Sequence, residues 1–89
     1  MRTVKQVNLE HLKILLQTVH PEHDHLFSVV MLAFITFNVV TENELADELR
    51  LSVPTIKRWV RGKNLPHRSI RPPIHKFLSD KLDNLSRQS

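Results

Sequence analysis

The sequence predicts a small all-α protein, a single domain over residues 1–89 built from about five helices. Three observations support this fold class. Apolar residues recur at helical spacing in successive segments. No segment shows the alternating pattern of a strand pair. Hydrophobic residues make up 40% and charged residues 25% of the chain, which is the balance of a globular domain rather than a disordered one.

The first two helices are predicted on either side of Pro21. Asn8 is a suitable N-cap for a helix over about 9–20, which ends near Pro21 because a residue before proline avoids the α region. Asp24 can cap a second helix that runs to about residue 38. This helix holds the most apolar stretch, which is too short to span a bilayer and is predicted to be buried, although its β-branched residues leave a strand possible.

The next two helices carry clear end signals. Thr41 and Glu44 have the spacing of a capping box before a helix over 42–49. Ser52 caps a helix over 53–61, and Gly62 stands where a helix end requires positive φ. A last helix is predicted over about 69–85, with two prolines in or before its first turn. Its apolar stripe consists of Ile70, Ile74, Phe77, Leu78, Leu82 and Leu85.

Two short helices joined by Arg50-Leu51-Ser52 have the geometry of a helix-turn-helix. The sequence from Thr41 to Pro66, with its Glu-Leu-Ala-Asp-Glu-Leu, Leu-Ser, Thr-Ile-Lys-Arg-Trp and Arg-Gly-Lys-Asn-Leu-Pro runs, resembles the phage-repressor (Cro/C1, Xre-type) DNA-binding domain. The resemblance is densest over 41–66, extends loosely over 23–85, and leaves the helix at 9–20 as an addition.

The resemblance implies a lambda-repressor-like fold with the helix-turn-helix proper at 41–62. It also implies a sequence-specific transcriptional regulator that inserts the helix at 53–61 into the major groove of DNA. Three residues depart from the family pattern, namely Glu42, Arg50 and Val60. Arg50 occupies a turn position that is often glycine, so we expect it to adopt positive φ at a cost of roughly 1 kcal/mol.

Charge is distributed unevenly along the chain. Residues 1–49 hold three basic and seven acidic residues, whereas residues 50–89 hold ten basic and two acidic ones. From Arg50 to Lys76 there are eight Lys or Arg and no Asp or Glu. Such a run indicates a surface for a polyanion, and double-stranded DNA is the expected partner.

Specific roles are predicted for residues of the helix-turn-helix and the segment after it. Leu45, Ala46, Leu49, Leu51, Ile56 and Trp59 are expected to pack the two helices together. Arg58 is expected to contact guanine, Val53 and Pro54 to contact thymine methyl groups, and Thr55 to contact a base or a phosphate. Phosphate contacts are expected from Lys57, Arg61, Lys63, Arg68 and Arg71, with neutral ones from Ser52 and Asn64.

Two alternatives to this function remain open. An excisionase or MerR-like protein also fits residues 55–61 with Leu65-Pro66, but such proteins place a β-wing after the recognition helix, where this sequence predicts a helix. An antitoxin-like or adaptor module would bind protein instead of DNA, and Glu42 and the helix at 9–20 favour it. An acidic partner would fit the basic face.

Other classes of function are not indicated. No spacing suggests a Ser-His-Asp triad, so we expect no enzyme, and cysteine is absent. His20, His23 and His25 are interpreted as solvated loop residues, so we expect no metal, cofactor or small-molecule ligand. His67 and His75 are expected to add pH-dependent DNA affinity. Without a signal segment, a cytoplasmic protein with no membrane contact is expected. A homodimer is possible through the helix at 9–20 or the last helix.

Overall fold

The computed structural model describes residues 3–20 and 23–88. Five α-helices and one 3₁₀ turn follow one another along the chain: α1 Val4–Thr18, α2 Asp24–Thr36, α3 Glu42–Leu49, α4 Val53–Val60, η1 Arg68–Ile70 and α5 Arg71–Gln88. The described residues contain no strand, which confirms the predicted all-α bundle. Within them, no helix is both long and apolar enough to cross a membrane.

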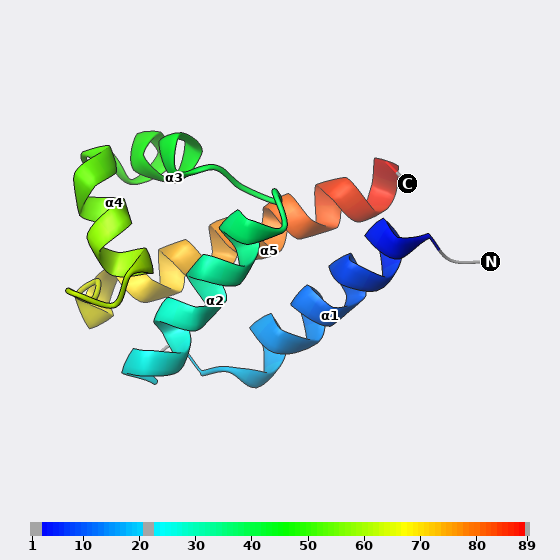
Figure 1. Cartoon of the computed structure of the whole chain (residues 1–89), viewed down its shortest axis with the longest axis horizontal. Coiled ribbons are helices and arrows are strands. Elements are labelled where there is room, and N and C mark those ends of the chain that lie inside the picture. The colour runs from blue at the N-terminus through cyan, green and yellow to red at the C-terminus, as the bar shows by residue number, and fades with distance from the viewer. Residues whose placement is uncertain (1–2, 21–22, 89) are drawn as a thin grey trace.

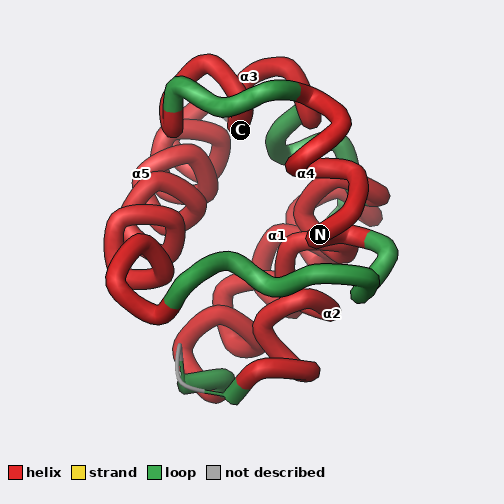
Figure 2. The backbone as a smooth tube through the Cα atoms, turned by 90° about the vertical axis from the view of Figure 1, so that its left-hand side faces the viewer, coloured by secondary structure: helices red, strands yellow, loops and turns green. Residues whose placement is uncertain are grey.

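The five helices form two groups, three longer helices and a pair of short ones. α1, α2 and α5 run along the molecule, while α3 and α4 lie together at one end of it (Figure 1). Seen from that end, the five helices surround a shared interior (Figure 2). One hydrophobic core fills it, with buried residues from all five helices. The pair α3 and α4 therefore packs against the three other helices through this core.

The start of α1 differs from the prediction. The helix begins at Val4, because the side chain of Thr3 caps it and forms a capping box with Gln6. Asn8, the predicted cap, lies inside the helix. α1 ends at Thr18, where Val19 turns extended, and Pro21 lies outside the described residues. The apolar stripe begins only at Leu9, so it does not mark the first turn that Thr3 caps.

Three successive helices end in the same motif. Asn38, Arg50 and Gly62 follow α2, α3 and α4 with φ values of 60°, 57° and 74°. In each case the next residue donates its N–H to a carbonyl five residues back: Val39 to Phe34 at 3.0 Å, Leu51 to Ala46 at 2.9 Å, and Lys63 to Arg58 at 3.0 Å. These are Schellman motifs. The positive φ of Arg50 and Gly62 is confirmed, whereas Asn38 was expected to be the last residue of its helix.

The core includes most of the residues that were predicted to fill it. Leu9, Leu12, Leu16 and Val19 of the α1 segment are buried, so this helix completes the core. Leu51 is an exception, because 39% of its surface is exposed. Its backbone N–H is tied to Ala46 in the turn after α3, and its side chain stays at the surface instead of entering the contact between α3 and α4.

Polar contacts join α5 to α3 and to α1. Glu44 accepts the backbone N–H of Thr41, as the predicted capping box requires, and its other oxygen accepts from Nζ of Lys81. His75 donates from Nε2 to the carbonyl oxygen of Leu16 at 3.0 Å, near the end of α1. This histidine therefore faces α1, contrary to the expectation that it acts at the basic surface.

Candidate nucleic-acid interface

α3 and α4 form a compact helix-turn-helix unit. Residues 50–52 join them, and the chain turns sharply between the two helices (Figure 1). The turn is fixed at both ends, because Arg50 closes the Schellman motif of α3 and the hydroxyl of Ser52 caps α4 by accepting from the backbone N–H of Thr55. Leu45, Ala46, Ile56 and Trp59 are buried, as expected for residues between the helices.

The solvent face of α4 is a narrow polar stripe. Pro54, Lys57, Arg58 and Arg61 are exposed, and their spacing of three and four residues places them on one side. Ile56 and Trp59 lie on the opposite side, in the core. A helix that is buried on one side and carries three cations on the other can lie in a groove without losing its packing.

The orientation of α4 is fixed by α2. The buried hydroxyl of Ser28 donates to the carbonyl oxygen of Trp59 at 2.6 Å, and the N–H of Gly62 donates to the same oxygen at 3.0 Å. The carbonyl belongs to the last turn of α4, whose carbonyls have no partner inside the helix. Ser28 therefore provides a hydrogen-bond donor to a carbonyl at the end of α4 and links α4 to α2.

The first turn of α4 is less available than predicted. Val53 is partly buried and packs against the core, so its predicted full exposure is wrong, whereas Pro54 is exposed as predicted. The hydroxyls of Ser52 and Thr55 lie 2.8 Å apart and bond to each other. Any contact from these hydroxyls to DNA must share or replace this bond.

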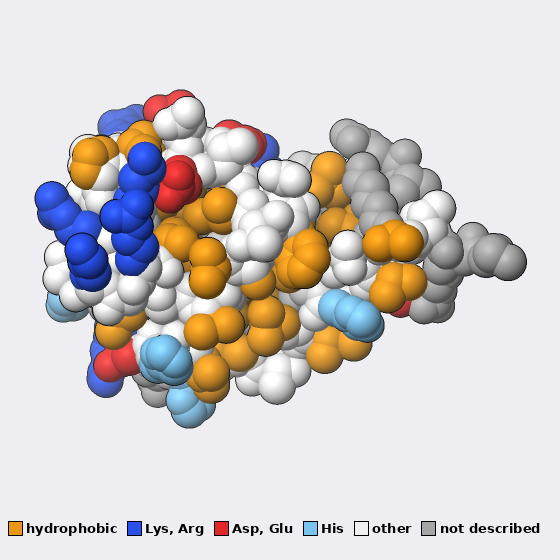
Figure 3. Space-filling model, viewed as in Figure 1, with side chains coloured by type: hydrophobic (Ala, Val, Ile, Leu, Met, Phe, Trp, Pro, Cys, Tyr) orange, Lys and Arg blue, Asp and Glu red, His pale blue; other side chains and the backbone are white. Residues whose placement is uncertain are grey.

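The segment after α4 adds further exposed cations. Lys63, Asn64 and Arg68, the residues expected to contact phosphates, are all exposed. His67 caps the 3₁₀ turn, since its Nδ1 accepts the backbone N–H of Ser69 at 3.1 Å, so its ring is engaged with the local backbone. Lys and Arg side chains gather at this end of the molecule, over α4 and the adjoining loop (Figure 3).

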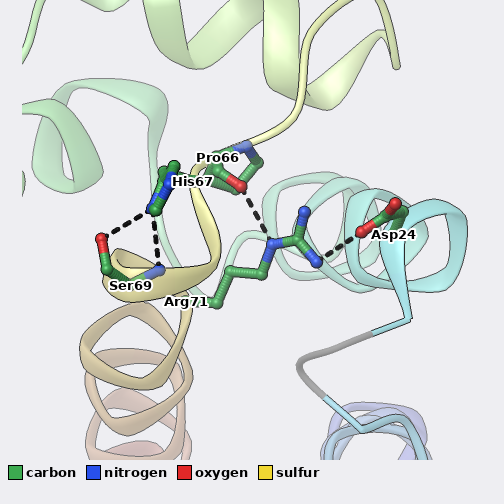
Figure 4. Close-up of polar contacts among 5 residues, drawn as sticks. All are labelled: Asp24, Pro66, His67, Ser69 and Arg71. Atoms are coloured by element: carbon green, nitrogen blue, oxygen red, sulfur yellow. Dashed lines mark hydrogen bonds and ion pairs between the residues drawn. The ribbon is translucent and has the colours of Figure 1, made fainter.

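Arg71 does not belong to this exposed set. Only 4% of it is exposed, and the predicted phosphate contact is therefore wrong. Its Nε donates to the carbonyl oxygen of Pro66 at 2.9 Å and its Nη1 to Asp24 at 2.7 Å (Figure 4). The guanidinium also lies 5.7 Å from the centre of the Phe27 ring. It is a buried clamp between the loop and the start of α2.

Asp24 is the acidic partner of this clamp. The hydrogen bond from Arg71 holds the pKa of Asp24 below its ordinary value of 3.8, and the nearby charges of Arg71 and Arg68 act in the same direction. The carboxylate therefore keeps its charge at neutral pH. Arg68 is exposed, and its positive charge helps to lower the pKa of Asp24. It is also one of the exposed cations at the α4 end of the molecule, which we call the basic end: Lys57, Arg58, Arg61, Lys63 and Arg68.

The exposed acids of the unit lie on α3. Asp47 and Glu48 are exposed, whereas Glu42 is half-buried in the first turn of that helix. The stripe of α4 is therefore basic and the outer side of α3 is acidic. A polyanion is attracted to α4 and repelled from α3, which restricts how it can approach.

Two positioning residues were not found from the sequence. Ser28 lies 31 residues from Trp59, and Asp24 lies 47 residues from Arg71. Neither pairing has a local sequence pattern, because each depends on how distant helices pack. Asp24 was expected only as a helix cap, but it lies within the first turn of α2, which begins after His23. The described residues hold no cluster of three His, Asp or Glu arranged for a metal ion.

Comparison of the chain with protein-family models, with curated proteins and with solved structures found no match.

Proposed function

We propose that this protein binds double-stranded DNA through α4 and regulates transcription by occupying a specific DNA sequence. The observation that carries the proposal is the stripe of Pro54, Lys57, Arg58 and Arg61 on the solvent face of α4. An α-helix fits the major groove of B-DNA, and the second helix of a helix-turn-helix is the one that enters it.

The roles of the basic residues follow from their positions. Arg58, in the last turn of α4, has a guanidinium that suits a bidentate contact to O6 and N7 of guanine. Lys57 and Arg61 flank it, and Lys63 and Arg68 lie in the segment beyond, where contacts to phosphates fix the orientation of the helix. The clamp of Arg71 supports this function indirectly, because it holds the loop that carries these outer cations.

The described helices also bear on the competing interpretations. An excisionase-like protein needs a β-wing after the recognition helix, but here the chain continues into η1 and α5. The resemblance over 41–66 to phage-repressor domains favours a groove-binding helix. The second candidate partner is an acidic protein that binds the same cations. The positive charge of the basic end would attract such a protein as well as DNA.

A salt titration tests the proposal. Binding to random-sequence duplex should weaken with a slope of log affinity against log salt of about −0.9 per phosphate contacted. Lys57→Ala should reduce that slope by about one contact. Lys13→Ala, an exposed lysine on α1, is the matched control and should leave the slope unchanged.

Sequence reading is tested separately on a site selected from a random pool. Arg58→Ala should weaken the selected site by roughly 1–3 kcal/mol and leave random DNA nearly unaffected. If the protein binds no DNA even at low salt, the proposed function is wrong, and an acidic protein becomes the partner to seek. Equal losses on selected and random DNA would show that Arg58 contacts only phosphates.

A further inference from the structure

The outer side of α2 is apolar. Leu26, Val29, Leu32 and Phe37 expose 45%, 40%, 45% and 50% of their surfaces. Their spacing of three to five residues places them along one side of the helix and its end. The other side of α2 is equally apolar and lies in the core. A helix that is apolar on nearly all sides is normally buried, so a helix of this composition with an open side points to a missing partner.

The apolar surface extends from α2 to α1. Ile14 is 60% exposed, and a shallow depression beside it is lined by His11, Leu15 and Thr18. Hydrophobic side chains run across the middle of the molecule over these two helices (Figure 3). We call the side chains of Ile14, Leu26, Val29, Leu32 and Phe37 the α1/α2 face.

We propose that the α1/α2 face binds the same face of a second copy of this chain. A twofold symmetric contact sets each patch against itself, so a patch of one charge repels its copy. The basic end of the molecule is excluded from such a contact for this reason. Residues 26–41 hold no Asp, Glu, Lys or Arg, so the α2 side of the face has no charge to repel its counterpart.

A dimer contact of ordinary size needs more surface than the α2 segment offers. A standard interface takes about 800 Å² from each partner. That is roughly one-eighth of the 5986 Å² that the chain exposes. The four exposed side chains of the α2 segment supply on the order of 300 Å², so the contact must include α1 as well. A stripe on α2 alone is therefore too small for a dimer contact.

The contact would leave the basic end open. Ser28, which ties α2 to α4, is four residues before Leu32, so α4 packs beside the Leu32 edge of the face. The cations Lys57, Arg58 and Arg61 are on the solvent side of α4, opposite its buried residues Ile56 and Trp59, so they stay exposed. The inference does not depend on DNA binding.

Sedimentation velocity of the full chain without DNA tests the proposal. From about 1 to about 100 µM, the wild type should shift from monomer to dimer. Leu32→Glu places a carboxylate in the face and should raise the dimer dissociation constant by at least about 100-fold. Leu65→Glu is the matched control, because Leu65 is 37% exposed in the loop after α4 and should leave the constant unchanged.

The same measurement can overturn the proposal. If the wild type stays monomeric at about 100 µM, the α1/α2 face does not bind a second copy of this chain. A different protein would then be the partner to seek for this face. A Leu32→Glu variant that dimerises as well as the wild type places the contact elsewhere. Far-UV circular dichroism checks that each variant is folded. If Leu32→Glu unfolds, Val29→Glu takes its place, with the same two outcomes.

Discussion

The guanidinium of Arg71 lies 2.7 Å from the carboxylate of Asp24, 47 residues away in the sequence. The contact joins the first turn of α5 to the first turn of α2, and the same guanidinium holds the carbonyl oxygen of Pro66 at 2.9 Å. A cation from the run between Arg50 and Lys76 is thus used inside the protein. It secures the loop that carries Lys63 and its neighbours.

Loss of this clamp should destabilise the protein. Arg71→Met leaves the carbonyl of Pro66 without this buried donor, so the free energy of unfolding should fall by about 1–3 kcal/mol. Urea unfolding followed by circular dichroism measures the change. Arg68→Met is the matched control, because Arg68 is exposed, and its effect should be within about 0.5 kcal/mol. Equal effects of the two variants would contradict the structural role of Arg71.

Stability should decline in acid because two carboxylates have lowered pKa values. Hydrogen bonds from Arg71 to Asp24 and from Lys81 to Glu44 hold each pKa below its ordinary value, 3.8 for Asp24 and 4.5 for Glu44. The unfolded chain therefore binds more protons in this range, so stability is full above the ordinary values and is lost as the pH falls through the lower, folded ones. Urea midpoints measured from neutral pH downward give the slope.

The Glu44→Gln variant isolates one of these groups. It should be less stable than the wild type at neutral pH, and its urea midpoint should change less with acid because one titrating carboxylate has been removed. Glu48→Gln, an exposed acid on the same helix, should keep the full wild-type dependence on pH. If Glu44→Gln has the same acid slope as the wild type, Lys81 does not lower the pKa of Glu44.

The turn between α3 and α4 should tolerate glycine. Arg50 has φ 57°, a region that only glycine occupies without cost. Arg50→Gly should therefore stabilise the protein by roughly 0.5–1 kcal/mol and raise the melting temperature by several degrees. Gly62→Ala, at φ 74°, should have the opposite effect. A lower melting temperature for Arg50→Gly would mean that its side chain contributes more than the backbone strain costs.

The bond between Ser28 and Trp59 should hold α4 in place. Ser28→Ala removes a buried donor from the carbonyl of Trp59, at a cost of about 1–2 kcal/mol. Tryptophan fluorescence during urea unfolding reports the loss, since the chain has one Trp. Ser69→Ala removes an exposed hydroxyl and should have little effect. If the proposed function is correct, Ser28→Ala also weakens DNA binding although Ser28 is buried away from the basic end.

The local structure of this chain was largely predictable from its sequence. The capping box of Thr41 and Glu44, the cap at Ser52 and the glycine after α4 each act within a few residues, so short patterns determined where α3 and α4 begin and end. The helical spacing of Leu9, Leu12 and Leu16 identified the buried side of α1 in the same way. Short-range signals of this kind do not depend on the rest of the fold.

The assignment of individual side chains to the site depended on tertiary structure. By sequence, Arg71 is one of eight similar cations, and only the packing of α5 against α2 places it beside Asp24 and away from solvent. The apolar segment of α2 likewise indicated burial, but α1 and α4 pack against only part of its circumference and leave Leu32 exposed. The sequence determined the helices and the sign of the charge, because these follow from local spacing and composition. Which residues face solvent was decided by contacts between segments 31 to 59 residues apart.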